Sequence, residues 1–197
     1  VHSGQKIICN SGYYQNQNHQ LNNISRSTVV HSTLIVDNLS VTRFSQDNKK
    51  KYALGNIKIF DKKFIKDKKT MYLRASHDGY LKTYGIIHKR EIEYDIKQFL
   101  LKGQDTLIKN KKFRSSNFEI RFHLYPGTKV TKTIDGKTVL IEVGNSGWKF
   151  TCNNFSIDVE TGLYFGKKNS YNENQNLFIY GETKNHDQVI NWELKKI

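Results

Sequence analysis

The sequence predicts an all-β protein, a large antiparallel β-sandwich built from many short strands. Three observations support this fold class. Apolar and polar residues alternate with a period of two over many short segments. Gly, Asp and Asn turn signals separate these segments, and the chain has one proline. No amphipathic segment reaches helical length. With no internal repeat and no linker, we expect residues 1–197 to form one domain.

The first half of the chain contains five predicted strands. Residues 5–10 form the first, and an Asn/Gln-rich, turn-like segment follows over 13–27, which we interpret as a long loop. The other strands predicted in this half lie at residues 31–37, 56–60, 72–76 and 84–95. A break at His77-Asp78-Gly79-Tyr80 separates the last two, since Asp-Gly is a strong turn signal.

The second half of the chain also contains several predicted strands. Residues 96–108 are ambiguous between a helical turn and a strand, whereas 118–125 alternate cleanly. Residues 129–134 and 138–143 predict a hairpin around Asp135-Gly136. We expect 148–152 to pair with 155–159. The remaining predicted strands lie at residues 162–166, 176–181 and 188–194.

The charge is strongly basic, with 32 Lys and Arg against 18 Asp and Glu, a formal net charge of +14. This favours polyanionic partners such as nucleic acid, an anionic membrane or an acidic polysaccharide. Nucleic-acid-binding motifs are absent from the sequence, and no apolar run is long enough to insert into a membrane. The lysine runs also fit an ordinary solvated surface without a specific ligand.

Two further features concern processing and redox state. The chain opens at Val1 close to a strand-like run and without a signal peptide, so we expect a fragment or processed product of a longer protein. Cys9 and Cys152 each alternate with apolar residues, which predicts inward positions. Their disulfide is one option in an oxidising compartment, and free thiols are the other.

Several strands place basic residues at alternate positions. Arg74 shares one side of its strand with Tyr72, His88 and Arg90 share another, and Arg121 and His123 share a third. If these strands are neighbours, one sheet face carries all five basic residues, and Arg forks bind carboxylate or sulfate groups well. We therefore predict substrate-binding roles for Arg74, His88, Arg90, Arg121 and His123. The alternative is an ordinary solvated sheet face with cross-strand Arg–Glu pairs.

Four short motifs follow one another in an order that resembles the C-terminal β domain of the heparinase II/III family of polysaccharide lyases. The motifs are Arg26-Ser27-Thr28-Val29-Val30-His31-Ser32-Thr33-Leu34, then His77-Asp78-Gly79-Tyr80 followed by Gly85-Ile86-Ile87-His88-Lys89-Arg90, then Arg121-Phe122-His123-Leu124-Tyr125-Pro126-Gly127, and finally Gly147-Trp148-Lys149-Phe150. The resemblance spans about residues 5–165 and implies the same antiparallel sandwich.

The resemblance also implies a function for the parent protein, which is cleavage of acidic polysaccharides by β-elimination. In the family the catalytic Tyr and its His or Asn partner belong to an upstream helical domain, and a further catalytic His lies in an H-x-H-x-D segment that this sequence lacks. We therefore expect this chain to be inactive alone and to form one wall of the substrate cleft. The implied location is periplasmic or at the cell surface.

His77 and Tyr80 are the weak catalytic candidates within the chain. A lyase removes the proton α to a uronate carboxylate and protonates the leaving oxygen, and His and Tyr suit these steps. His88 and His123 would join them if the isolated chain were active. The alternative is a structural turn, with Asp78 capping backbone donors, Gly79 at positive φ and Tyr80 packed over the edge.

His31 matches a family histidine that helps to hold a structural divalent metal, so the resemblance implies a zinc ligand here. Zinc needs about four ligands, and the usual partners would lie upstream. A histidine within the core is the alternative. Three functions remain open: a lyase domain, a non-catalytic module that binds anionic glycans, and a purely structural domain.

Overall fold

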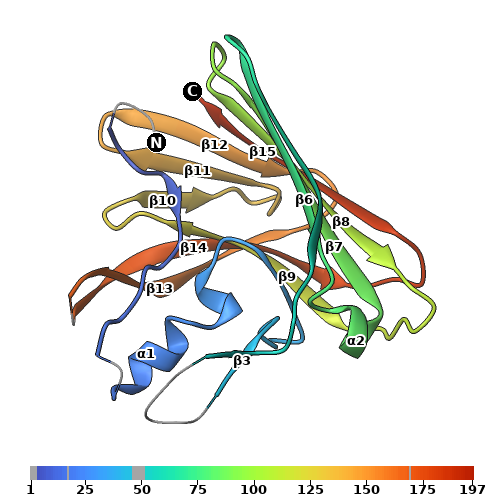
Figure 1. Ribbon diagram of the computed structural model, residues 1–197. Helices are drawn as coiled ribbons and strands as arrows, with labels where there is room; N and C mark the ends of the chain where they lie inside the picture. Colours follow the sequence, from blue (N-terminus) through green and yellow to red (C-terminus); the bar gives the residue numbers. More distant parts are fainter. Residues whose placement is uncertain (1–3, 17, 46–51, 169) are drawn as a thin grey trace.

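A computed structural model describes residues 4–16, 18–45, 52–168 and 170–197 of the chain (Figure 1). In chain order the elements are β1 (Ile8–Cys9), α1 (Gln20–Ile24), the 3-10 turn η1 (Thr28–Val30), β2 (Leu34–Val36), β3 (Arg43–Phe44), β4 (Ala53–Leu54), β5 (Ile59–Lys66), β6 (Thr70–His77), α2 (Leu81–Tyr84), β7 (Ile86–Asp95), β8 (Leu100–Lys109), β9 (Asn117–Leu124), β10 (Lys129–Lys132), β11 (Thr138–Val143), β12 (Ser146–Cys152), β13 (Ile157–Lys167), β14 (Ser170–Glu182) and β15 (Gln188–Lys196).

Two antiparallel sheets carry the fold. The larger sheet has the order β10-β11-β12-β15-β8-β7-β6-β5, and the smaller has the order β1-β9-β14-β13 with β2 also paired to β9. Figure 1 shows them as two layers, with α1, β3 and α2 toward the same end of the molecule. The predicted antiparallel β-sandwich is confirmed.

The core lies between the two sheets and follows the period-two pattern of the sequence. In β11 and β15, buried and exposed residues alternate along most of each strand. The rings of Phe122, Phe150 and Trp192 meet at its centre, with centroid separations of 4.7 Å for Phe122–Trp192 and 4.8 Å for Phe122–Phe150. Aromatic contacts of this kind bury large apolar areas and join the sheets firmly.

The hairpin predicted around Asp135-Gly136 is confirmed, since β10 and β11 pair across it and Gly136 has a φ of +66°. The predicted pairing of residues 148–152 with 155–159 is wrong. Strand β12 pairs with β11 and β15, while the chain crosses to the other sheet and β13 pairs with β14. The ambiguous segment 96–108 contributes strand β8, and the predicted loop 13–27 contains the short helix α1.

The break after β6 is filled by α2 before β7 returns along β6. Gly85 ends α2 in the left-handed conformation, with a φ of +66°. A Cβ there would lie 2.4 Å from the carbonyl carbon of Lys112, so only glycine fits this turn. No helix in the described ranges is both long and apolar enough to cross a membrane.

Candidate functional site

The five basic residues predicted to share one face lie in three separate places, so that arrangement is wrong. Arg74 lies on the outer face of the eight-stranded sheet, because its register sets it among outward residues. His88 and Arg90 lie on the inner face of the same sheet. Arg121 and His123 belong to β9, in the other sheet. Alternation sorts residues within a strand, whereas the neighbours of that strand depend on contacts far apart in sequence.

Asp105 is the centre of the inner cluster and is fully buried. His88 Nε2 lies 2.6 Å and Arg90 Nε 2.7 Å from Asp105 Oδ1. Arg90 Nη2 and Trp192 Nε1 lie 3.1 and 2.8 Å from Asp105 Oδ2. Burial alone would raise the pKa of Asp105, but Arg90 and His88 outweigh it and lower that pKa. The carboxylate therefore stays ionised, with four donors on its two oxygens.

A chain of imidazoles leads from the turn after β6 to Asp105. The backbone N–H of Gly79 donates to His77 Nδ1 at 3.2 Å, so His77 carries its proton on Nε2. His77 Nε2 then donates to His88 Nδ1 at 3.0 Å, and His88 Nε2 donates to Asp105. Burial and the neighbouring His88 lower the pKa of His77 to about 4, and burial lowers the pKa of His88. Both rings are neutral near pH 7, and all four ring nitrogens are engaged.

The His77-Asp78-Gly79-Tyr80 segment has the contacts of a structural corner. Asp78 Oδ1 accepts a hydrogen bond from the backbone N–H of Lys58 at 2.8 Å. Tyr80 is buried, and its hydroxyl lies 3.1 Å from the carbonyl oxygen of Leu39. Burial raises the pKa of Tyr80. Positive φ was expected at Gly79 but is not found there; instead, a Cβ at Gly79 would press on the side chain of Val41 at 3.0 Å.

Arg121 lies on the outer face of the five-stranded sheet and is almost fully buried. Its guanidinium bonds Glu119, with Nε 2.8 Å from Oε2, and Nη1 pairs with Glu160 Oε1. It also packs over the ring of Phe178, 5.4 Å from the centroid. These acid pairs lie on a nearly buried face, so they differ from the solvated face with cross-strand Arg–Glu pairs that was the alternative. Arg74 also has an acidic partner, because its Nη2 lies 2.7 Å from Asp61 Oδ1.

His123 clamps the N-terminal segment onto β9. Its Nδ1 lies 2.9 Å from Ser11 Oγ, and its Nε2 lies 2.9 Å from the carbonyl oxygen of Val29. Its backbone N–H donates to Ser32 Oγ at 2.9 Å. His123 is buried, and burial lowers its pKa. The ring therefore joins two distant parts of the chain through both of its nitrogens.

Ser32 connects these clusters, and the sequence reasoning did not single it out. Its backbone carbonyl accepts a hydrogen bond from Arg90 Nη1 at 2.5 Å, and its hydroxyl donates to the carbonyl oxygen of Cys9 at 2.6 Å. Its backbone N–H donates to Asn10 Oδ1 at 3.0 Å. The second and third sequence motifs, through Arg90 and His123, thus both form hydrogen bonds with the first motif, which is the segment 26–34. Its place within a quoted motif was the only signal that pointed to it.

His31 directly precedes this junction and is partly buried, which lowers its pKa. A neutral imidazole is the form that binds metals. Across the described ranges, however, no three His, Cys, Asp or Glu side chains gather where they would hold a metal ion. Zinc needs about four ligands, so these residues do not fit a complete zinc site.

Cys9 and Cys152 are both free thiols and lie in different sheets, so the disulfide considered from the sequence does not form. Cys152 is buried as predicted. The inward position predicted for Cys9 is wrong, because Cys9 pairs with His123 on the outer side of β9 and is only partly buried. Burial raises the pKa of Cys9 to about 11. Both sulfurs therefore remain protonated thiols near neutral pH.

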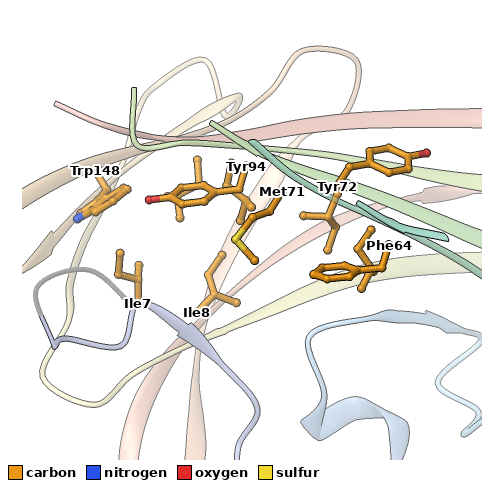
Figure 2. A pocket seen from close by; sticks show the side chains of 11 residues that line it. Ile7, Ile8, Phe64, Met71, Tyr72, Tyr94 and Trp148 are labelled. Atoms are coloured by element: carbon orange, nitrogen blue, oxygen red, sulfur yellow. The ribbon is translucent and has the colours of Figure 1, made fainter. Parts of the chain in front are cut away.

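A hollow of about 390 Å³ opens between the sheets. Figure 2 shows Ile7 and Ile8 of the N-terminal segment facing Met71 and Tyr94 of the large sheet. All of the lining residues are apolar or aromatic, namely Ile7, Ile8, Phe64, Met71, Tyr72, Leu73, Ile92, Tyr94, Leu101, Trp148 and Leu194. With no carboxylate, histidine or basic side chain in its lining, the hollow suits apolar contacts and offers no cationic group to an acidic sugar.

Comparison with known proteins gives a family match over nearly the whole chain. A family model described as "Heparinase II/III-like, C-terminal" matches residues 1–193. The crystal structure of heparan sulfate lyase HepC from Pedobacter heparinus superposes with a TM-score of 0.76 and 14% sequence identity, over 98% of this chain and 29% of the lyase. A crystal structure of heparinase III superposes with a TM-score of 0.70 and 19% identity, over 100% of this chain and 28% of that protein.

One curated relative has a name that does not refer to a lyase. FtsZ-localized protein C from Caulobacter vibrioides is 33% identical over 99 residues, which cover 46% of this chain and 17% of that protein. The chain thus spans less than a third of each of these larger proteins. At such low identity the solved structures establish the fold and leave the chemistry open.

Proposed function

Because the chain belongs to the heparinase II/III-like family as its C-terminal β domain, we propose that it is the β-sandwich part of a lyase that cleaves acidic, uronate-containing polysaccharides by β-elimination. One observation carries the proposal: the family match covers residues 1–193, almost the entire chain. The net charge of +14 supports it, because a basic surface attracts polyanionic substrates. The periplasm or cell surface, where such polymers occur, is the location that accompanies this proposal.

The contacts of the candidate residues support a division of labour. β-Elimination needs one group that removes the proton α to the carboxylate and another that protonates the leaving oxygen. Both ring nitrogens of His77, His88 and His123 are engaged within the fold, and the Tyr80 hydroxyl bonds backbone carbonyls. We therefore place the acid and base on a preceding helical domain of the intact polypeptide. This chain then supplies one wall of the cleft.

The test compares this 197-residue chain with the intact polypeptide encoded by the gene. Both are incubated with heparan sulfate, alginate and other uronate polymers, and unsaturated uronate products are followed by ultraviolet absorbance. We expect products from the intact polypeptide only, and binding of at least one polymer by this chain. An intact, folded polypeptide that neither binds nor cleaves any of the polymers would overturn the proposal.

A second candidate is a non-catalytic module that binds anionic glycans or supports assembly. The observation that favours it is the 33% identity to FtsZ-localized protein C, whose name states no enzymatic activity. Binding of heparin by the intact polypeptide without any unsaturated product, weakening as salt rises, would favour the glycan-binding form of this candidate. Indifference to heparin and alginate at every salt concentration would favour a structural or assembly role.

A further inference from the structure

Arg26 is a motif arginine that has no acidic partner among the residues that the structure describes. Its neighbours in the motif have structural contacts: the backbone N–H of Val41 donates to Thr28 Oγ1 at 3.0 Å, and Ser32 forms the junction described above. Among the described residues, no carboxylate forms an ion pair with Arg26. Arg74, Arg90 and Arg121 differ, because each is paired with an acid.

Two aromatic rings hold the Arg26 guanidinium in place. Its central carbon lies 5.0 Å from the ring centroid of Phe44 and 5.7 Å from that of Tyr13. Aromatic faces attract a guanidinium but use none of its N–H donors. The Nη1 nitrogen is buried and has no hydrogen-bond partner among the described residues. A buried donor without a partner costs free energy. The guanidinium also carries N–H donors on Nε and Nη2, and these are the ones that an anion from solvent would use.

Tyr13 adds an exposed ring beside this cation. The Tyr13 residue is 41% exposed. Its hydroxyl accepts a hydrogen bond from Asn22 Nδ2 at 2.9 Å, and the same nitrogen donates to the carbonyl oxygen of Tyr14 at 2.6 Å. Because Asn22 is fully buried, it fixes the position of Tyr13. A fixed, exposed ring next to a guanidinium is suited to a sugar that carries an anionic group.

From this geometry we infer that Arg26 and Tyr13 form an anion-binding subsite for an acidic sugar, with the carboxylate or sulfate on the Arg26 fork and the sugar ring against Tyr13. The inference rests on the proposed function, since it names where this domain contacts its polysaccharide. It differs from the earlier prediction, which assigned this role to five other basic residues.

The test measures binding of size-matched heparin, alginate and neutral dextran oligosaccharides to the whole chain by calorimetry. The variants are Arg26→Ala, Arg26→Lys and Tyr13→Ala, and the control is Arg114→Ala, which removes an exposed arginine of equal charge elsewhere. We expect Arg26→Ala to weaken binding at least about tenfold, Arg26→Lys to weaken it less, and Arg114→Ala to change it by about twofold or less. Dextran should not bind.

The outcomes separate the inference from the proposed function. Loss with Arg26→Ala on both heparin and alginate assigns a carboxylate to the fork, and loss on heparin alone assigns a sulfate. Equal effects of Arg26→Ala and Arg114→Ala would overturn the subsite while leaving glycan binding intact. No binding by the unmodified chain would instead count against the proposed contact with polysaccharide. If Arg26→Ala does not fold, Arg26→Lys decides, because wild-type affinity for that folded variant contradicts recognition by the guanidinium fork.

Discussion

Arg90 and Ser32 are 58 residues apart in sequence, yet Arg90 Nη1 donates a hydrogen bond to the backbone carbonyl of Ser32 at 2.5 Å. The same guanidinium holds buried Asp105 through two further hydrogen bonds. One side chain thus ties a motif on β7 to the motif on segment 26–34 and satisfies a buried carboxylate. In these contacts, residues of the family motifs hold together segments of the fold that are far apart in sequence.

We predict that Arg90→Ala lowers the free energy of unfolding by about 3–5 kcal/mol, because it leaves Asp105 buried with a reduced set of donors. Urea denaturation followed by circular dichroism measures this change. Arg114→Ala is the matched control and should change stability by less than about 0.5 kcal/mol, since Arg114 is exposed. Similar free energies of unfolding for the two variants would show that the Arg90–Asp105 contacts do not stabilise the fold.

His123→Asn should loosen the N-terminal segment. The Asn side chain cannot reach both Ser11 and Val29 as the imidazole does, so we expect a loss of about 2 kcal/mol from one buried and one partly buried hydrogen bond. Hydrogen exchange should speed up across residues 11–32 more than in β11 or β15. An equal increase in the hydrogen-exchange rate throughout the chain would contradict a local role for His123. His186→Asn, at an exposed position, provides the comparison.

Stability should fall as the pH drops from about 6.5 toward 4. The folded-state pKa of His77 is lowered from 6.5 to about 4, so within this window the unfolded chain binds a proton that the folded chain does not. Each such histidine reduces stability by about 1.4 kcal/mol per pH unit. His88 and His123, whose pKa values are also lowered, act in the same direction.

The measurement for this pH dependence is urea denaturation at intervals between pH 4 and 7. Replacing His77 by Gln should make the slope shallower by about one histidine's contribution, since the proton taken up on unfolding is removed. His186→Gln, at an exposed position outside the buried network, is the comparison variant. A slope unaffected by His77→Gln would assign the pH dependence to other groups.

Gly103→Ala tests the packing of Trp192 on β8. A Cβ at Gly103 would lie 2.0 Å from a ring carbon of Trp192, whose Nε1 donates to Asp105. We expect a loss of about 1–3 kcal/mol and a shifted tryptophan fluorescence spectrum. Gly147→Ala is the control, because the nearest atom to the added methyl is Cγ1 of Ile197 at 3.1 Å, a contact that a shift of a few tenths of an ångström relieves. Equal stability of both variants would contradict this tight contact.

Tyr80→Phe distinguishes a catalytic corner from a structural one. Removing the hydroxyl leaves the carbonyl oxygens of Leu34 and Leu39 without this donor, so we expect about 1 kcal/mol of lost stability. The rate of unsaturated uronate formation by the intact polypeptide should not change. A loss of activity of a hundredfold or more in a folded variant would return Tyr80 to the list of catalytic residues.

Residue order alone showed which residues of most strands share a side, because a strand has a period of two that local alternation reveals. The hairpin at Asp135-Gly136 and the burial of Cys152 followed in the same way. The family motifs could also be read directly from the residue order. These are all local properties of the chain.

The pairing of strands that are far apart in the sequence could be seen only in the folded structure. Arg74 and Arg90 lie on opposite faces of one sheet, while Arg121 lies in the other sheet, so the shared basic face does not form. Asp105 and Ser32 were not predicted as partners of Arg90, because nothing local links positions far apart in sequence. Strand pairing depends on the burial of all inner faces at once, and that balance is a property of the whole fold.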